Sequence, residues 1–242
     1  MFRSIAIVVA LCFATVTAQA ALLSRAGGQA YYDDVLNITW LADANYALTN
    51  GFGVPASRNV AYRGEIGTRG SMDWSTANLW IDGMNAANHL GASNWRLPFV
   101  VDTGSPDCDW SFVGGTDCGY NVQTMTGTTV YSEMAHLYYV TLGNSSSGCP
   151  GSPLFCLTNT GPFANVQGEH YWSGSSDSVR PWAVWDFHFA FGYQAPNDSG
   201  NYNHAWAVHD GDPFSVVPVP PAVFLFGSAL GVMGWMRRKA VA

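Results

Sequence analysis

The stretch Asn94-Trp95-Arg96-Leu97-Pro98 places an aromatic ring, a guanidinium, a branched apolar side chain and a proline in consecutive positions. The guanidinium of Arg96 holds five donors in a fixed plane, and its stem can pack on the neighbouring Trp95. We expect Arg96 to lie half-buried and to bond several backbone carbonyl groups, with Leu97 in the core and Pro98 directing the exit of the chain. The stretch therefore predicts an architectural node.

The segment before this node has the spacing of a helix. Apolar residues recur at Trp74, Ala77, Trp80 or Ile81, and Met84. Asp73 or Ser71 can cap the start of this helix, Gly83 weakens it, and Gly91 is expected to end it. A second helix is predicted from the cap Ser132 to Gly143.

Strands are predicted on both sides of these helices. Residues 30–41 read as a hairpin, because aromatic and β-branched residues flank a turn that contains Asp and Asn. In the last third, residues 171–173 and 182–191 read as antiparallel strands, and residues 205–209 are expected to pair with the second of these. The pattern predicts an α+β fold in one domain of residues 21–215.

The first 20 residues resemble a secretory signal peptide. Arg3 precedes a short apolar run, and Ala18-Gln19-Ala20 forms a small-x-small cleavage site. The run is too short for a permanent membrane span. We therefore expect export through the inner membrane and exclude residues 1–20 from the fold.

The last 27 residues, 216–242, combine a proline-rich start, an apolar run over residues 222–236 and a basic end. One interpretation is a C-terminal transmembrane helix that anchors the domain outside the cell, with the basic residues inside. The order of features also resembles the PEP-CTERM sorting signal, carried here by Pro218, Pro220, Arg237, Arg238 and Lys239. This copy has Val219 where the family's motif has Glu. The resemblance implies recognition by an exosortase, removal of the tail, and delivery to the cell surface or an exopolysaccharide matrix.

Charge excludes several classes of function. Between Ala21 and Val217 the chain has six arginines, no lysine and all 17 acidic residues, a formal charge of about −11. Phosphate backbones repel such a domain, so we expect no nucleic-acid partner. The lack of lysine also excludes Schiff-base chemistry.

Four cysteines remain after the signal segment: Cys108, Cys118, Cys149 and Cys156. An even number in an exported chain favours two disulfides. Of the three possible pairings we favour Cys108–Cys118 and Cys149–Cys156, because each closes one loop rich in Gly, Ser or Pro. A metal site is the alternative, although the Cys-x-x-Cys spacing is missing.

Several motifs follow one another in a characteristic order: Asp33 to Leu41, Met72-Asp73-Trp74, Trp95-Arg96-Leu97-Pro98, Glu133-Met134, Tyr171-Trp172-Ser173-Gly174, Trp182-Ala183-Val184 and Trp206-Ala207-Val208. This set resembles the Lcl C-terminal domain family, which is distantly similar to the C-type-lectin-like and formylglycine-generating-enzyme superfamily. About thirty residues separate Pro98 from Glu133, where the family has few, so we expect an inserted loop. His209 stands where the family often has Arg. The resemblance implies a C-type-lectin-like fold with long disulfide-stapled loops that is used for surface recognition, glycans included.

Each candidate binding residue also has a possible structural role. Asp102, Asp107 and Asp109 crowd the insertion, where they are read either as a calcium site or as a solvated acidic loop. Nine tryptophans remain after trimming, and aromatic faces stack on sugar rings. Trp40, Trp74, Trp95, Trp185 and Trp206 occupy core-type positions. The better ligand-binding candidates are Trp110 in the insertion, and Trp182 with Asp186 on the polar face of a strand.

The chain has no Gly-x-Ser-x-Gly motif of serine hydrolases, no P-loop, no Gly-x-Gly-x-x-Gly motif for dinucleotides and no His-Glu-x-x-His motif of zinc proteases. We therefore expect a non-enzymatic surface or biofilm-matrix protein whose lectin-like domain binds polysaccharide or another matrix component, without a cofactor unless calcium binds. The alternatives are a hydrolase that uses Asp and Glu on such polymers, and a purely structural matrix protein. A carboxylate pair in a cleft favours the hydrolase.

Overall fold

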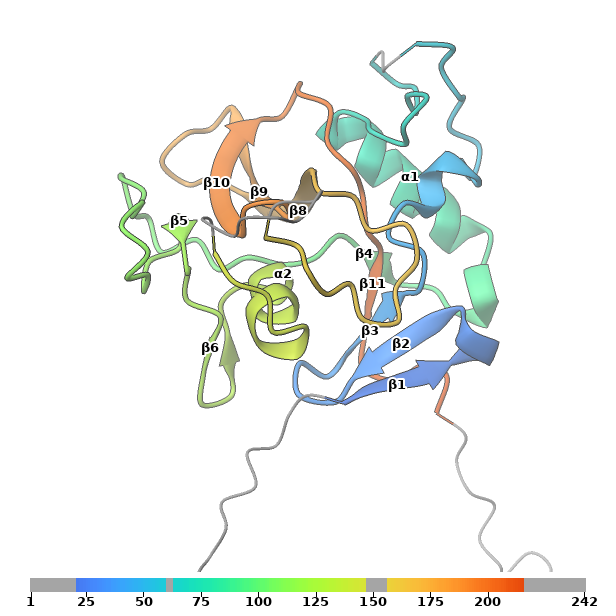
Figure 1. Ribbon diagram of the computed structural model, residues 1–242. Helices are drawn as coiled ribbons and strands as arrows, with labels where there is room; N and C mark the ends of the chain where they lie inside the picture. Colours follow the sequence, from blue (N-terminus) through green and yellow to red (C-terminus); the bar gives the residue numbers. More distant parts are fainter. Residues whose placement is uncertain (1–20, 60–62, 147–155, 216–242) are drawn as a thin grey trace, which may run out of the picture.

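The computed structural model describes residues 21–59, 63–146 and 156–215 (Figure 1). This part has the predicted α+β class, with antiparallel sheets, two helices and a disulfide between Cys108 and Cys118. The predicted signal peptide, the sorting segment and Cys149 lie outside the described residues. The second predicted disulfide, from Cys149 to Cys156, therefore stays a prediction.

A five-stranded antiparallel sheet is built from both ends of the described chain. Its order is β1 (Leu22–Arg25), β2 (Ala30–Asp33), β3 (Ile38–Leu41), β11 (Val208–Asp210) and β4 (Trp95–Arg96). The predicted hairpin is β2 and β3. The carboxylate of Asp33 closes its turn by accepting hydrogen bonds from the amides of Val35 and Leu36, and Asn37 takes the left-handed conformation that asparagine tolerates.

A four-stranded antiparallel sheet follows the order β5 (Gly119–Tyr120), β10 (Tyr193–Asp198), β9 (Ala183–His188) and β8 (His170–Ser176), and β6 (Met125–Thr126) pairs with β7 (Thr129–Val130). The expected pairing of residues 205–209 with the strand at 182–191 is wrong. β10 takes that place, and β11 crosses to the other sheet with Val208 opposite Trp40. The crossing buries Trp206, whose indole N–H donates to the Leu41 carbonyl.

Both predicted helices are present. α1 (Trp74–Ala86) is capped by Asp73, whose carboxylate accepts from the Thr76 amide at 2.7 Å. The prediction that Gly91 ends this helix is wrong, because the chain already takes the left-handed conformation at Asn88. Ser132 caps α2 (Glu133–His136), which continues as a π-helical turn over Leu137–Thr141. Short 3-10 turns lie at Ala26–Gly28, Tyr46–Leu48 and His89–Gly91.

The core is aromatic. Its largest fully buried side chains include six tryptophans: Trp40, Trp80, Trp95, Trp172, Trp185 and Trp206. Four of the five predicted core positions are therefore confirmed. The fifth, Trp74, is only half-buried, since its indole N–H reaches the Ser173 carbonyl at 2.9 Å from the start of α1.

The two ends of the described chain lie together at the lower edge of the molecule in Figure 1. Arg25 on β1 pairs with Asp212 after β11 at 2.8 Å. Within residues 21–59, 63–146 and 156–215, no helix combines the length and the apolarity that a membrane crossing needs.

Gly83 has a role that helix propensity does not predict. A Cβ at this position of α1 would lie 2.2 Å from the carbonyl oxygen of Phe52. On an open helix Gly→Ala is stabilising by about 1 kcal/mol. Here we expect Gly83→Ala to lower the free energy of unfolding by about 1–3 kcal/mol, because the loop that carries Phe52 must move. Urea unfolding measures the change, with the exposed Leu79→Ala as control (expected below about 0.5 kcal/mol). A stabilised Gly83→Ala variant would contradict this role.

Candidate functional site

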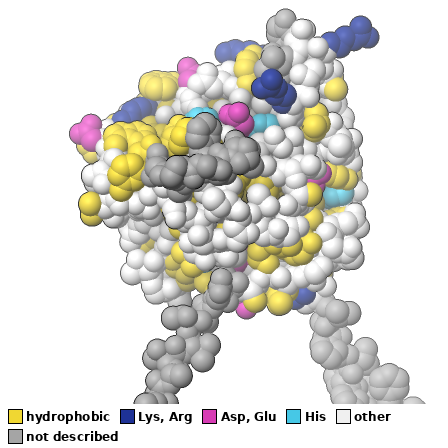
Figure 2. Space-filling view, viewed as in Figure 1, with side chains coloured by type: hydrophobic (Ala, Val, Ile, Leu, Met, Phe, Trp, Pro, Cys, Tyr) yellow, Lys and Arg dark blue, Asp and Glu magenta, His cyan; other side chains and the backbone are white. Residues whose placement is uncertain are grey.

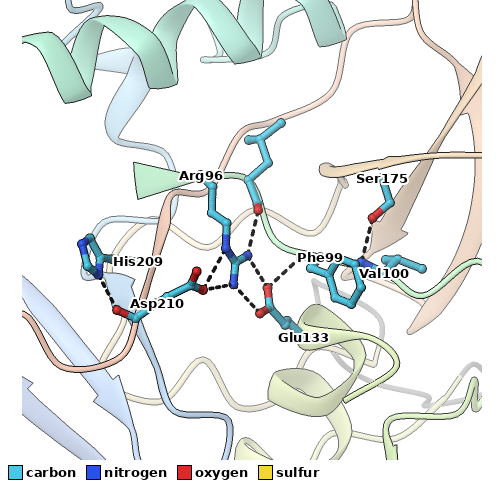
Figure 3. Close-up of polar contacts among 8 residues, drawn as sticks. Arg96, Phe99, Val100, Glu133, Ser175, His209 and Asp210 are labelled. Atoms are coloured by element: carbon cyan, nitrogen blue, oxygen red, sulfur yellow. Dashed lines mark hydrogen bonds and ion pairs between the residues drawn. The ribbon is translucent and has the colours of Figure 1, made fainter. Parts of the chain in front are cut away.

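Arg96 is the centre of an ion-pair network (Figure 3). Its Nη1 and Nη2 donate to the two carboxylate oxygens of Glu133 at 2.8 and 2.7 Å. Its Nε and Nη2 donate to Asp210 at 3.0 and 2.5 Å, and Nη1 also reaches the Leu97 carbonyl at 3.1 Å. All five N–H groups therefore have an acceptor.

The expected role of the Trp-Arg-Leu-Pro node is confirmed, but its partners differ from the expectation. Arg96 bonds two carboxylates and one carbonyl, not several carbonyls. Leu97 is buried as predicted, and Pro98 is buried as well. Burial alone lowers the pKa of the guanidinium, but the hydrogen bonds and charges of Glu133 and Asp210 outweigh it and raise the pKa above its usual value. The network ties β4 to α2 and to β11.

Glu133 and Asp210 both contact Arg96 and are therefore candidates for the carboxylate pair that the hydrolase hypothesis requires. However, one nitrogen of Arg96, Nη2, lies within 2.7 Å of both carboxylates. The guanidinium fills the space in which a glycosidic bond has to lie between an acid and a nucleophile. This pair is therefore structural.

A cleft of about 560 Å³ opens beside the network, between α1 and β4. Its walls include Asp82 and Asn85 from α1 and Arg96, Phe99 and Asp210 from the other side. The volume lies in the range of small-ligand sites.

A second candidate is a cluster of rings that we call the aromatic surface: Trp110, Phe112, Tyr120 and Tyr193. Trp110 lies 5.5 Å from both tyrosine rings, and Phe112 stacks on Tyr120 at 4.6 Å. Trp110 and Phe112 are 49% and 48% exposed. Figure 2 shows hydrophobic side chains gathered at the upper left of the molecule, the side on which Figure 1 places β5 and β10.

The inserted loop positions this surface. Cys108 and Cys118 join the two sides of the loop around Trp110, and the Asp109 and Tyr120 backbones are hydrogen-bonded at 2.9 Å. Gly119 lets these segments meet, because it has a φ of +106° and a Cβ there would lie 1.9 Å from the Asp109 carbonyl oxygen. The loop therefore holds Trp110 against Tyr193 of the sheet.

The structure separates the three predicted ligand-binding residues. Trp182 is 58% exposed but precedes β9, at the opposite end of the β9–β10 pair from Tyr193. Asp186 is fully buried, so its prediction as a surface ligand is wrong. The physical reason is that every residue of β9 is buried, so the strand has no solvent-facing side.

Asp186 instead holds polar groups inside the molecule. One carboxylate oxygen accepts hydrogen bonds from the side-chain Nδ2 atoms of Asn197 and Asn203 at 2.6 and 2.9 Å. The same oxygen lies 2.9 Å from Nδ1 of His170. The other nitrogen of His170 lies 3.3 Å from the hydroxyl of Tyr193. Burial raises the pKa of Tyr193 to about 12, with added effects of Asp186 and Tyr120, so this phenol stays protonated at neutral pH.

The predicted calcium site is not formed. Within the residues that the structure describes, no three His, Cys, Asp or Glu side chains are grouped so that they could hold a metal ion. Asp102 accepts hydrogen bonds from the Gly104 and Ser178 amides, and Asp109 accepts from Ser111. These two carboxylates stabilise turns of the insertion, while Asp107 is exposed. They are therefore not brought together around one ion.

Sequence reasoning missed Phe112, Tyr120 and Tyr193, and it missed Glu133 and Asp210 as partners of Arg96. The density of aromatic residues in the insertion could have indicated Phe112 and Tyr120, but not Tyr193, which lies on β10. Comparisons with protein-family models, with curated proteins and with solved structures found no match for this chain.

Proposed function

We propose that this protein binds polysaccharide through the aromatic surface. The observation that carries the proposal is the contact of Trp110 with Tyr120 and Tyr193 in a cluster that leaves the Trp110 ring half exposed. Sugar rings have apolar faces that stack on exposed aromatic rings, and the protonated hydroxyl of Tyr193 can bond sugar hydroxyl groups.

The position of this surface suits a protein held at the cell surface. β5 and β10 lie at the upper left of Figure 1, whereas the two ends of the described chain leave at the lower edge. A domain attached or sorted through its C-terminal segment then presents the aromatic rings away from the attachment.

The wider proposal follows the two resemblances. The chain is exported, handled by an exosortase-type sorting machinery that recognises the membrane-inserted tail, and delivered to the cell surface or to a biofilm matrix. Its domain is C-type-lectin-like, related to the Lcl C-terminal domain family, and acts by binding without catalysis. Support comes from the signal-like start, the PEP-CTERM-like end and the α+β fold with a stapled loop.

Trp110→Ala should weaken binding to exopolysaccharide isolated from the producing organism by about tenfold, because one stacked ring contributes on the order of 1–1.5 kcal/mol. The measurement is a saturation curve on immobilised polysaccharide, with the medium assayed for released fragments. Trp182→Ala is the matched control, since Trp182 is at least as exposed as Trp110 but lies apart from the cluster. It should bind like the wild-type protein.

Equal losses in the two variants would exclude the aromatic surface as the binding site. Release of sugar fragments would favour the hydrolase. Absence of saturable binding would leave the purely structural matrix role.

A further inference from the structure

The cleft beside Arg96 is separate from the aromatic surface, and its walls have a distinct hydrogen-bonding character. All five donors of Arg96 are already used. The side-chain amide of Asn85 bonds both the N–H and the C=O of Trp95, which leaves one of its two N–H groups for a ligand. The Nδ2 of Asn78 donates to the Trp74 carbonyl.

Apart from the second N–H of Asn78 and of Asn85, the polar side-chain groups left for a ligand are acceptors. They are the carboxylate of Asp82, the second carboxylate oxygen of Asp210 and the Oδ1 of Asn78. Asp82 is exposed, and the Asp210 side chain is 76% exposed. A molecule that binds the two carboxylates of this cleft has to donate hydrogen bonds to them.

Charge narrows the class of ligand further. The positive charge of Arg96 is balanced by Glu133 at 2.7 Å, so Asp82 and Asp210 leave the cleft negative. Carboxylated and phosphorylated sugars are repelled by such a site, whereas an ammonium group is attracted and offers three donors. Apolar contact is available as well, since Ile81 and Leu97 line the cleft and Phe99, 44% exposed, stands at its edge.

From this combination we infer that the cleft binds a protonated amino sugar, of the glucosamine type. The ammonium group pairs with Asp82 and Asp210, the hydroxyl groups reach Asn78, and the ring lies against Phe99. The site is independent of the aromatic surface and extends the protein's binding capacity to a cationic polysaccharide.

The test is calorimetric titration of the full-length protein with a glucosamine trimer at pH 6, where the amines are charged. Saturable binding is expected, at least about tenfold stronger than for the N-acetylated trimer, since acetylation removes the charge. A galacturonic acid trimer should not bind. Trilysine binding as tightly as the amino sugar would overturn the sugar assignment in favour of a general cation site.

Two variants locate the site. Asp82→Asn should weaken binding about tenfold, whereas Asp107→Asn, an exposed carboxylate on the insertion, should not. Gly174→Leu fills the cleft, and its Cβ makes only ordinary contacts, 3.5 Å to the Leu97 carbonyl oxygen, so the fold should tolerate it.

Binding that survives Gly174→Leu, or falls equally with Asp82→Asn and Asp107→Asn, overturns the proposal, as does the absence of binding. Trp110→Ala should leave glucosamine binding unchanged, so this result and the polysaccharide result at the aromatic surface can fail independently.

Discussion

Arg96→Met is expected to lower the free energy of unfolding by about 3–5 kcal/mol. The substitution keeps an apolar stem and removes the guanidinium. Glu133, which is buried, then loses its two strongest donors and keeps only the Phe99 amide at 2.7 Å and the start of α2. An uncompensated buried carboxylate accounts for most of the loss. Chemical denaturation in urea at pH 7 measures it.

Three related variants separate the contributions. Arg96→Lys should recover part of the loss only, since one ammonium cannot replace five donors in a plane. Asp210→Asn should cost less than about 1 kcal/mol, because the Asp210 side chain is largely exposed.

The double variant Arg96→Met/Glu133→Met should be more stable than Arg96→Met alone, because it no longer buries a charge. If Arg96→Met unfolds with the same free energy as the wild-type protein, the network does not hold β4, α2 and β11 together.

Acidification from pH 7 to pH 5 is expected to lower the free energy of unfolding by about 4 kcal/mol. Burial, helped by the neighbouring His170, lowers the pKa of His188 to about 3, and burial lowers that of His204 to about 4. Both start from an ordinary value of 6.5. Above pH 6.5 both histidines are neutral in the folded and unfolded chains, so their protonation does not change the free energy of unfolding.

Below pH 6.5 His188 and His204 bind protons in the unfolded chain but stay neutral in the folded chain. The free energy of unfolding therefore falls as the pH drops towards the folded-state pKa values. At pH 5 each histidine contributes a loss of about 2 kcal/mol, from about 1.4 kcal/mol for each pH unit below 6.5. Burial also lowers the pKa of His136, in opposition to Asp33, which adds a loss of the same sign.

Urea unfolding at pH 7 and pH 5 measures the effect. His204→Gln should reduce the difference in the free energy of unfolding between pH 7 and pH 5 by about 2 kcal/mol, because it removes one titrating group. This holds whatever the substitution does to stability at pH 7. His209→Gln, the same substitution at a less buried position, is the matched control variant. Equal stability of the wild-type protein at both pH values would show that His188 and His204 accept protons in the folded state.

The elements that the sequence predicted well depend on neighbouring residues. The helix over Trp74–Ala86 follows from apolar spacing and from the Asp73 cap three residues before its bonded amide. The turn of the hairpin follows from Asp33 and Asn37, which act within a few positions. The Cys108–Cys118 disulfide was predicted because it closes one loop rich in Gly, Ser or Pro, and the two cysteines are only ten residues apart.

Predictions failed where distant segments had to be matched. Alternation along residues 182–191 indicated which residues share a face, but not which strand lies beside them, and β10 displaced the expected partner. The alternation also placed Asp186 on a polar face, although every residue of β9 is buried. One carboxylate oxygen of Asp186 contacts His170, Asn197 and Asn203 inside the molecule.

The sequence by itself determined the α+β class, the two capped helices, the hairpin, the stapled insertion and the burial of Leu97. Each of these depends on hydrogen bonds or apolar spacing within a short stretch of chain. Only the tertiary structure decided that Arg96 meets Glu133 and Asp210, 37 and 114 residues away, and that the rings around Trp110 gather on one surface. Such contacts form when separate segments pack together, and the spacing of residues along the chain does not encode which segments meet.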